Sequence, residues 1–259
     1  MTRPDSEHNV LPGLQGRVVI VTGSGRGIGR GIALSLASRG CRLIITSRTP
    51  EDLDPLVSEI EEAGFSATSV VAELRDPATP MRLVEASLDQ YGRLDGLVNN
   101  AGVMCPPFTL TSEGIELTFA VNVIGYFLLA NNLIPLMRSV KSSRVVNVSS
   151  IANYRVRTID WENINSESTY KGINSYSLSN LFRIMLTIEL EQRLRRNKYE
   201  TTAVCCHPGV ILTDLFRFLP WVTKNPLFPK LINKLFLHEA SQGILPRMEA
   251  ITGSNLLGG

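Results

Sequence analysis

The residues best suited to chemistry near the start of the chain are four glycines within seven positions, from Gly23 to Gly29. They follow the apolar run 17–21 and precede apolar residues at helical spacing, so they stand where a buried strand would turn into a helix. Glycine permits a tight turn and a close backbone approach, and a helix N-terminus presents unpaired N–H groups to a phosphate. A turn without a ligand is the simpler interpretation, but four glycines are more than a turn needs. We therefore expect a dinucleotide pyrophosphate here. The residues expected to contact it are Gly23, Ser24, Gly25, Arg26, Gly27, Ile28 and Gly29.

The second predicted strand ends in Ser47 and Arg48 rather than in an acidic residue, and Arg26 lies inside the glycine cluster. In NAD-binding sites an acidic residue at this place binds the ribose 2′-hydroxyl, and its charge would repel a 2′-phosphate. A guanidinium can bind that phosphate with two hydrogen bonds. The two arginines therefore favour NADP(H) over NAD(H). The alternative is that an arginine here is only a solvated surface charge.

Apolar runs that alternate with helical patterns predict the elements that must position these residues. Strands are predicted at 17–21, 41–46, 69–72, 94–98, 144–148 and 201–206. Helices are predicted at 27–38, 51–63, 81–91, 113–139 and 174–196. Such alternation implies βαβ units and a parallel sheet with helices on both faces. We expect an α/β fold with one Rossmann-type, doubly wound domain over residues 16–259, preceded by a polar tail at 1–15.

Composition excludes several other classes of protein. The 259 residues, 44% of them hydrophobic, suffice for one large domain with a sizeable core. The 26 Lys and Arg against 24 Asp and Glu are too balanced for a nucleic-acid-binding surface. The four cysteines lack zinc-type spacing, so neither a metal site nor a disulfide framework is expected. The N-terminus lacks a signal-peptide pattern, and polar residues interrupt the apolar segment 121–137, which favours a core helix in a cytoplasmic protein.

These motifs in combination resemble the short-chain dehydrogenase/reductase family, from about residue 16 to residue 213. Thr22-Gly23-x-x-x-Gly27-x-Gly29 is similar to the family's cofactor loop. Asn99-Asn100-Ala101-Gly102 is similar to the segment beside the adenosine ribose. Glu73, followed by Leu74, stands where the family usually has an aspartate at the adenine. The resemblance implies further cofactor contacts from a loop over the nicotinamide, formed by Pro208, Gly209, Val210 and Thr213.

The same resemblance implies a catalytic group of Asn, Ser, Tyr and Lys. Asn122 matches the helix asparagine that binds a water on the family's proton-relay path. Ser150 aligns best with the serine that hydrogen-bonds the substrate carbonyl, and Ser149 is the alternative. Tyr176 matches the tyrosine that exchanges a proton with the substrate oxygen.

Asn180 departs from the family pattern, because a lysine usually stands four residues after the tyrosine. That lysine binds the nicotinamide ribose and supplies a positive charge; asparagine can hydrogen-bond a hydroxyl but carries no charge. General acid–base catalysis contributes about 10²–10⁴-fold, and a loss within that range is expected, chiefly in oxidation, where Tyr176 must act as a base. Lys171 precedes this helix and Arg183 lies three residues beyond Asn180 near the same face. Either could approach as a substitute cation, but neither occupies the aligned position, and each is expected to be a surface charge.

The segment between Ser150 and Tyr176 resembles the insertion of the retinol dehydrogenase-like branch, through residues 160–165 and 170–172. Members of that branch act on hydrophobic alcohols and carbonyls, such as retinoids, steroids and lipid aldehydes, and many have an N-terminal membrane anchor. We expect an NADP(H)-dependent oxidoreductase that transfers a hydride between nicotinamide and such a substrate. The alternative is a catalytically impaired NADP(H)-binding protein that acts as a sensor or interaction protein.

The apolar and basic segment 216–237 permits three interpretations: a substrate lid, an interfacial membrane helix, or ordinary core. Its position after the nicotinamide loop favours a lid at 214–238, with peripheral membrane contact through 216–237 as the second interpretation. The resemblance further implies a homodimer that packs through the predicted helices 113–139 and 174–196.

Overall fold

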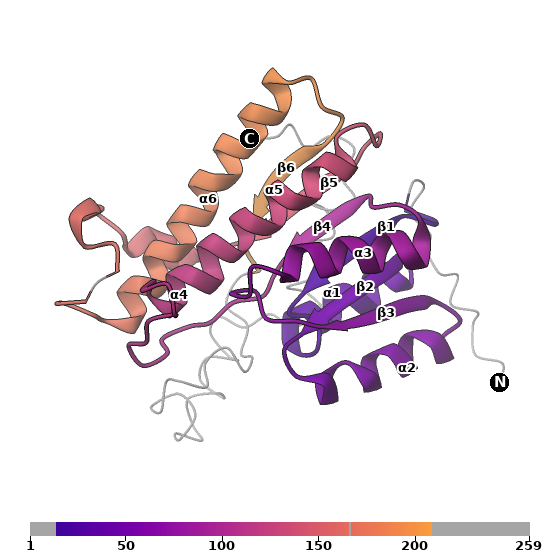
Figure 1. Ribbon diagram of the computed structural model, residues 1–259, viewed down its shortest axis with the longest axis horizontal. Helices are drawn as coiled ribbons and strands as arrows, with labels where there is room; N and C mark the ends of the chain where they lie inside the picture. The colour runs from indigo at the N-terminus through magenta and orange to yellow at the C-terminus, as the bar shows by residue number, and fades with distance from the viewer. Residues whose placement is uncertain (1–13, 166, 209–259) are drawn as a thin grey trace, which may run out of the picture.

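A computed structural model describes residues 14–165 and 167–208, and its centre is one sheet of six parallel strands (Figure 1). The strand order is β3-β2-β1-β4-β5-β6. The strands are β1 (Val18–Thr22), β2 (Arg42–Ser47), β3 (Ser66–Val71), β4 (Gly96–Asn99), β5 (Arg144–Val148) and β6 (Thr202–Cys206). The predicted α/β, doubly wound parallel sheet is confirmed. The predicted contacts Gly209, Val210 and Thr213 and the segment 214–238 lie outside the described residues.

Helices cover both faces of this sheet (Figure 1). The α-helices are α1 (Gly27–Ala37), α2 (Asp54–Glu62), α3 (Thr79–Tyr91), α4 (Leu117–Phe119), α5 (Gly125–Met137) and α6 (Gly172–Arg196). A π-helical turn, η2 (Ala120–Ile124), joins α4 to α5, and the 3-10 turns are η1 (Pro50–Asp52), η3 (Ile151–Arg155) and η4 (Trp161–Asn163).

Two apolar layers fill the space between the sheet and its helices. In β1, Val19 and Val21 belong to the layer under α1 and α2, whereas Val18 and Ile20 belong to the layer under α3, α5 and α6. All five residues of β1 are buried, as expected for a central parallel strand with helices on both faces. The sheet is therefore a rigid platform for the loops that leave its carboxyl edge.

Strand order reverses between β1 and β4. From β1 the chain continues to β2 and β3 on one side, and from β4 to β5 and β6 on the other. The connections that follow β1 and β4 consequently lead toward opposite edges of the sheet, and the carboxyl ends of these two strands are where open α/β sheets bind ligands.

The predicted helix 113–139 is shorter and less regular than its sequence pattern indicates. It begins at Leu117, because the Glu116 carboxylate accepts hydrogen bonds from the backbone N–H groups of Thr118 (2.8 Å) and Phe119 (3.0 Å) and so caps it. The π-helical turn then interrupts its regular hydrogen bonding. The third strand also differs from the prediction, since it begins at Ser66 rather than at residue 69.

The helical stretch Leu117–Met137 is long and apolar enough to cross a membrane by length and composition alone. However, 56% of its most apolar window is buried. Leu129, Leu133 and Met137 pack in the apolar layer against the sheet. This packing is that of a core helix.

Candidate functional site

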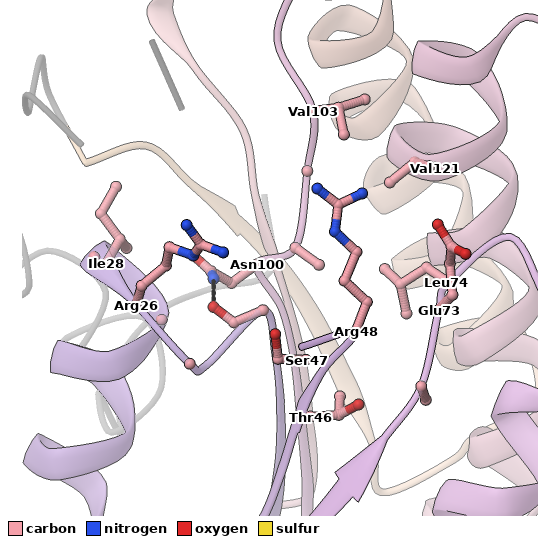
Figure 2. A pocket seen from close by; sticks show the side chains of 17 residues that line it. Arg26, Ile28, Thr46, Ser47, Arg48, Glu73, Leu74, Asn100, Val103 and Val121 are labelled. Carbon is pink, nitrogen blue, oxygen red and sulfur yellow. Dashed lines mark hydrogen bonds between the residues drawn. The ribbon is translucent and has the colours of Figure 1, made fainter. Parts of the chain in front are cut away.

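A pocket opens at the crevice between the ends of β1 and β4 (Figure 2). The sequence-predicted residues that line it are Gly23, Gly25, Arg26, Gly27, Ile28, Gly29, Ser47, Arg48, Glu73, Leu74, Asn100, Ala101 and Gly102. Thr46, Ala72, Val103 and Val121 also line it and were not predicted. Thr46 lies at the end of β2 and Ala72 directly follows β3, so the rule that ligands meet the carboxyl ends of parallel strands could have found both.

The glycine turn packs directly against the loop after β4. Gly23 has φ +62°, and a Cβ atom there would lie 2.8 Å from Cα of Ala101, so a larger residue would be both strained and crowded. The Thr22 hydroxyl accepts hydrogen bonds from the backbone N–H groups of Asn100 and Ala101, each at 3.0 Å. The Asn100 side chain donates back to the Thr22 carbonyl at 3.0 Å. The two loops therefore form one fixed wall of the pocket.

Ser24 does not face the pocket, although the sequence placed it among the cofactor contacts. It is fully buried, and both its hydroxyl (3.2 Å) and its backbone N–H (3.1 Å) donate to the carbonyl of Thr46. Its observed contacts join the glycine turn to β2.

Charged side chains surround the pocket mouth. Figure 2 shows Arg48 extending across the pocket, with its guanidinium directed toward Val103 and Val121. Among the described residues, no carboxylate forms an ion pair with Arg48. Arg26, in contrast, forms an ion pair with Asp52 at 2.9 Å. An anion at this mouth would meet Arg48 without first breaking an ion pair.

Glu73 lies on the opposite part of the mouth from the glycine turn (Figure 2). Its carboxylate pairs with Arg75 at 3.1 Å, so its negative charge is partly balanced. Ser47, at the end of β2, accepts a hydrogen bond from the backbone N–H of Thr49 at 3.3 Å and brings no charge.

Tyr176 lies in the second turn of α6 and is buried. Ser150 caps η3, which packs against α6, and its Oγ accepts a hydrogen bond from the Ala152 N–H at 3.2 Å. Neither the Ser150 hydroxyl proton nor the Tyr176 hydroxyl has an acceptor within the described part of the chain. The alternative serine, Ser149, donates its hydroxyl to the main-chain oxygen of Asn180 at 3.0 Å.

Asn122 occupies the π-helical turn and is fully buried. Its Oδ1 accepts from the N–H of Val103 (2.9 Å), and its Nδ2 donates to the carbonyl of Val103 and to Oγ of Ser179, each at 3.0 Å. Because Val103 lines the pocket, Asn122 fixes the pocket wall to α6.

Asn180 is fully buried and does not line the pocket. Its Nδ2 donates to the main-chain oxygen of Tyr176 at 2.8 Å, and its Oδ1 lies 3.4 Å from Nη1 of Arg183. The Ser149 hydroxyl also lies 3.5 Å from Oδ1, so the observed amide contacts are with two other residues of α6, Tyr176 and the buried Arg183, and with Ser149.

The prediction that Arg183 is a surface charge is wrong, whereas Lys171 is exposed as expected. Arg183 is only 4% exposed, because main-chain oxygens of Asn122 (2.8 Å) and Val148 (2.9 Å) accept its N–H groups inside the protein. A cation therefore lies close to Asn180, although not at the aligned position.

The remaining site expectations concern the loop after β6 and metal binding. Pro208 follows β6 and is half-buried, but the rest of its predicted loop is outside the described residues. Within residues 14–165 and 167–208, no cluster of His, Cys, Asp and Glu is suited to hold a metal ion.

A parallel sheet with a glycine-lined pocket at its switch point defines a dinucleotide-binding fold. Residues 17–220 match the short chain dehydrogenase family, and the chain belongs to that family, as its motifs predicted.

Two curated relatives are named as retinol dehydrogenases. Retinol dehydrogenase 11 of Homo sapiens is 35% identical over 214 residues, a match that covers 81% of this chain and 66% of the relative. Retinol dehydrogenase 14 of Mus musculus is 39% identical over 223 residues, covering 80% of this chain and 65% of the relative. The chain thus spans about two thirds of the length of these relatives.

Solved structures agree with the fold. A short chain dehydrogenase from Burkholderia cenocepacia J2315, in complex with NADP, is 26% identical with a TM-score of 0.76, and the match covers 95% of both chains. A short chain dehydrogenase/reductase from Burkholderia phymatum, in complex with NAD, is 23% identical with a TM-score of 0.67, covering 95% of this chain and 82% of the other. The fold therefore occurs with either nicotinamide dinucleotide.

Proposed function

We propose that the protein is an NADP(H)-dependent oxidoreductase that reduces hydrophobic carbonyl compounds. The observation that carries this proposal is the pocket at the switch point, with its glycine wall and with Arg48 across its mouth. The similarity to retinol dehydrogenases supports the substrate class, and the similarity to a dehydrogenase solved with NADP supports the cofactor.

The charges at the mouth favour a 2′-phosphate over a 2′-hydroxyl. Ser47 and Arg48 follow one another at the end of β2, where a carboxylate would bind the ribose diol of NAD. Arg48 is exposed and has no carboxylate partner among the described residues, so its guanidinium is available for bidentate binding of a phosphate. Arg26 is nearby, but its ion pair with Asp52 must be weakened before it contributes fully.

Replacing Arg48 tests this preference directly. Arg48→Ala is expected to weaken NADPH binding by about 10–100-fold, because charge-assisted hydrogen bonds to a phosphate contribute about 1.5–3 kcal/mol. NADH binding is expected to change less than twofold. Fluorescence titration of both nucleotides measures this, with Arg42→Ala as the control, since Arg42 begins the same strand and is also exposed. Equal wild-type affinities for NADPH and NADH would contradict the preference.

In reduction, the bound cofactor would supply the hydride, and the protein must supply a proton and orient the carbonyl. Tyr176 is the proposed proton donor, and its hydroxyl proton has no acceptor among the described residues. Ser150 is the proposed hydrogen-bond donor to the carbonyl, since its hydroxyl proton is likewise available. The Ser149 hydroxyl already donates to Asn180, which favours Ser150 over the alternative.

Asn180 is proposed to stand in the place of the usual catalytic lysine. Its amide is engaged with Tyr176 and Arg183, so it supplies neither a charge nor, in the observed rotamer, a contact to a ligand in the pocket. A neutral tyrosine can still donate a proton, whereas oxidation needs it as a base. We therefore propose that reduction is the favoured direction.

Turnover with a panel of carbonyls tests the activity. NADPH consumption is expected with retinal, a steroid ketone and a long-chain aldehyde, and to be much slower with a short polar aldehyde. Tight NADPH binding without turnover of any panel member would contradict the enzyme and support a non-catalytic cofactor-binding protein.

The substrate lid, the membrane contact, the cellular location and the oligomeric state of the protein are also proposals. A substrate lid at 214–238 and peripheral membrane contact through 216–237 rest on the sequence, because these residues lie outside the described part of the chain. We propose a cytoplasmic protein that meets its hydrophobic substrate at a membrane surface and does not bind nucleic acid. A homodimer is proposed through α5 and α6, which expose the apolar side chains Phe127, Met185 and Ile188.

A further inference from the structure

Arg183 is a buried cation that no carboxylate of the described residues balances. It lies on α6 with 4% of its surface exposed, and among the described residues no Asp or Glu pairs with it. Burying a charge is costly unless its polar groups are hydrogen-bonded. The surrounding structure must therefore supply acceptors for the guanidinium.

Those acceptors are main-chain oxygens from three segments that meet at the carboxyl edge of the sheet. Nε donates to Asn122 in the π-helical turn (2.8 Å), Nη1 donates to Val148 at the end of β5 (2.9 Å), and Nη2 approaches Ala101 after β4 (3.4 Å). The guanidinium also lies 4.3 Å from the ring centroid of Tyr126, whose hydroxyl donates to the same Ala101 oxygen at 2.9 Å. One side chain thus joins the three segments to α6.

The same guanidinium lies immediately behind the pocket wall. Ala101 and Gly102 line the pocket, and a Cβ atom added to Gly102 would lie 2.9 Å from Nη2 of Arg183. Nη1 is 3.4 Å from Oδ1 of Asn180, and the Asn180 main-chain oxygen accepts the Ser149 hydroxyl. Arg183 therefore contacts both the wall of the pocket and the segment that leads to Ser150.

We propose that Arg183 is a positioning residue, which holds the nicotinamide half of the site (the Asn122 turn and the end of β5 that leads to Ser150) and places a positive charge near position 180, although not at it. It fixes the Asn122 turn and the end of β5, and its charge lies behind a wall that an anionic dinucleotide would contact. This inference rests on the proposed function, because it assigns Arg183 to the site of that reaction.

The first test compares two ligands of different length in Arg183→Met and in a control, Arg17→Met. Arg17 forms an ion pair with Asp95 (2.9 Å) at the other end of the strands and lies away from the pocket. In Arg183→Met, NADPH binding is expected to weaken about tenfold more than binding of 2′,5′-ADP, which lacks the nicotinamide half. The kcat for retinal is expected to fall about 100-fold, because misplaced reacting groups lose rates of this order. Arg17→Met is expected to lower the melting temperature and to leave kcat within twofold.

Equal weakening of both ligands in Arg183→Met, or a kcat like that of Arg17→Met, would overturn the inference. If the wild type shows no turnover, the proposed function fails, and the two affinities alone still decide whether Arg183 acts on the nicotinamide half. Arg183→Lys keeps the charge but not the planar fork, so it is expected to recover part of the kcat; no recovery over Arg183→Met contradicts a role for the charge.

The second test moves the positive charge from position 183 to position 180. Asn180→Lys alone would put a second buried cation beside Arg183, 3.4 Å from the present Oδ1, so that variant is expected to unfold at a lower temperature. The double variant Asn180→Lys/Arg183→Asn removes this repulsion and is expected to bind NADPH at least as tightly as the wild type. If the double variant binds NADPH no better than Arg183→Met, the two positions are not interchangeable and the inference is overturned.

Discussion

For individual residues, burial decides which side chains of the site stay neutral. Burial raises the pKa of Tyr126 far above its usual value, so this hydroxyl remains a donor to Ala101 across the working pH range. Burial likewise raises the pKa of the Cys205 thiol at the end of β6. These groups contribute fixed hydrogen bonds and packing, and neither competes with Tyr176 as the proposed proton donor.

Cys41 gives the clearest pH-dependent prediction. Burial, reinforced by the charge of Asp95, raises the pKa of its thiol from 9.0 to about 12. The folded state therefore keeps this proton when the unfolded state has lost it, so stability falls as the pH rises from about 9 to about 12. Between pH 8 and pH 10.5, Cys41→Ala is expected to lose about 2 kcal/mol less free energy of unfolding than the wild type. Urea unfolding at both pH values measures this difference, and equal losses in the two proteins would show that the thiol titrates normally.

The burial of Arg183 could not be predicted from the sequence. Arginine is usually exposed, and a position three residues after Asn180 gives no sign of burial. The oxygens that accept its protons belong to Ala101, Asn122 and Val148, which are distant in sequence. The sequence indicated that Arg183 lies near the same helix face as Asn180, but only the folded arrangement shows that its guanidinium is buried there.

At the level of elements, local patterns predicted the strands better than the central helix. The predicted strand 144–148 is β5 without any change, because its apolar run is bounded by clear turn residues. The π-helical turn at 120–124 was not predicted, since it accompanies the Asn122 side chain bonding to the backbone of Val103. That contact depends on a loop from another part of the chain, and no periodicity encodes it.

The pocket shows the same contrast between features that local sequence patterns predict and features that only the fold shows. The glycine turn and Arg48 were predicted, because tight turns and strand ends have sequence signals. Ser24 was placed in the same motif but points to Thr46, and Val121 reaches the pocket only through the packing of the helix that carries it. Motif membership therefore located the pocket, whereas the direction of each side chain required the fold.

For the whole molecule, the two ends of the parallel strands differ in function: the carboxyl ends surround the pocket, and the amino ends carry a cluster of ion pairs. The carboxyl edge carries the pocket, and the amino edge is joined by Asp95, which is 4% exposed. This carboxylate accepts hydrogen bonds from Arg17 (2.9 Å), Arg93 (2.6 Å) and the backbone N–H of Val18 (2.9 Å). The structure therefore places a stabilising cluster at the edge remote from the proposed chemistry.

Asp95→Ala should separate stability from ligand binding. It leaves buried donors without an acceptor, so a loss of about 3–5 kcal/mol in the free energy of unfolding is expected. The Kd for NADPH is expected to stay within twofold at a temperature where the variant is folded. Denaturant titration and nucleotide binding check the two parts, with Asp89→Ala, an exposed site on α3, as the control. Weakened NADPH binding in the folded variant would show that the two edges are coupled.

The activity proposed for this protein is hydride transfer from NADPH to a hydrophobic carbonyl, with Tyr176 as the proton donor. Incubation of retinal with NADPH deuterated at its transferable position, followed by mass spectrometry of the alcohol, tests it most directly. The wild type is expected to yield alcohol that carries deuterium, and Tyr176→Phe to form it about 10²–10⁴-fold more slowly. Wild-type protein that binds NADPH but yields no deuterated alcohol from retinal, the steroid ketone or the long-chain aldehyde would contradict the claim.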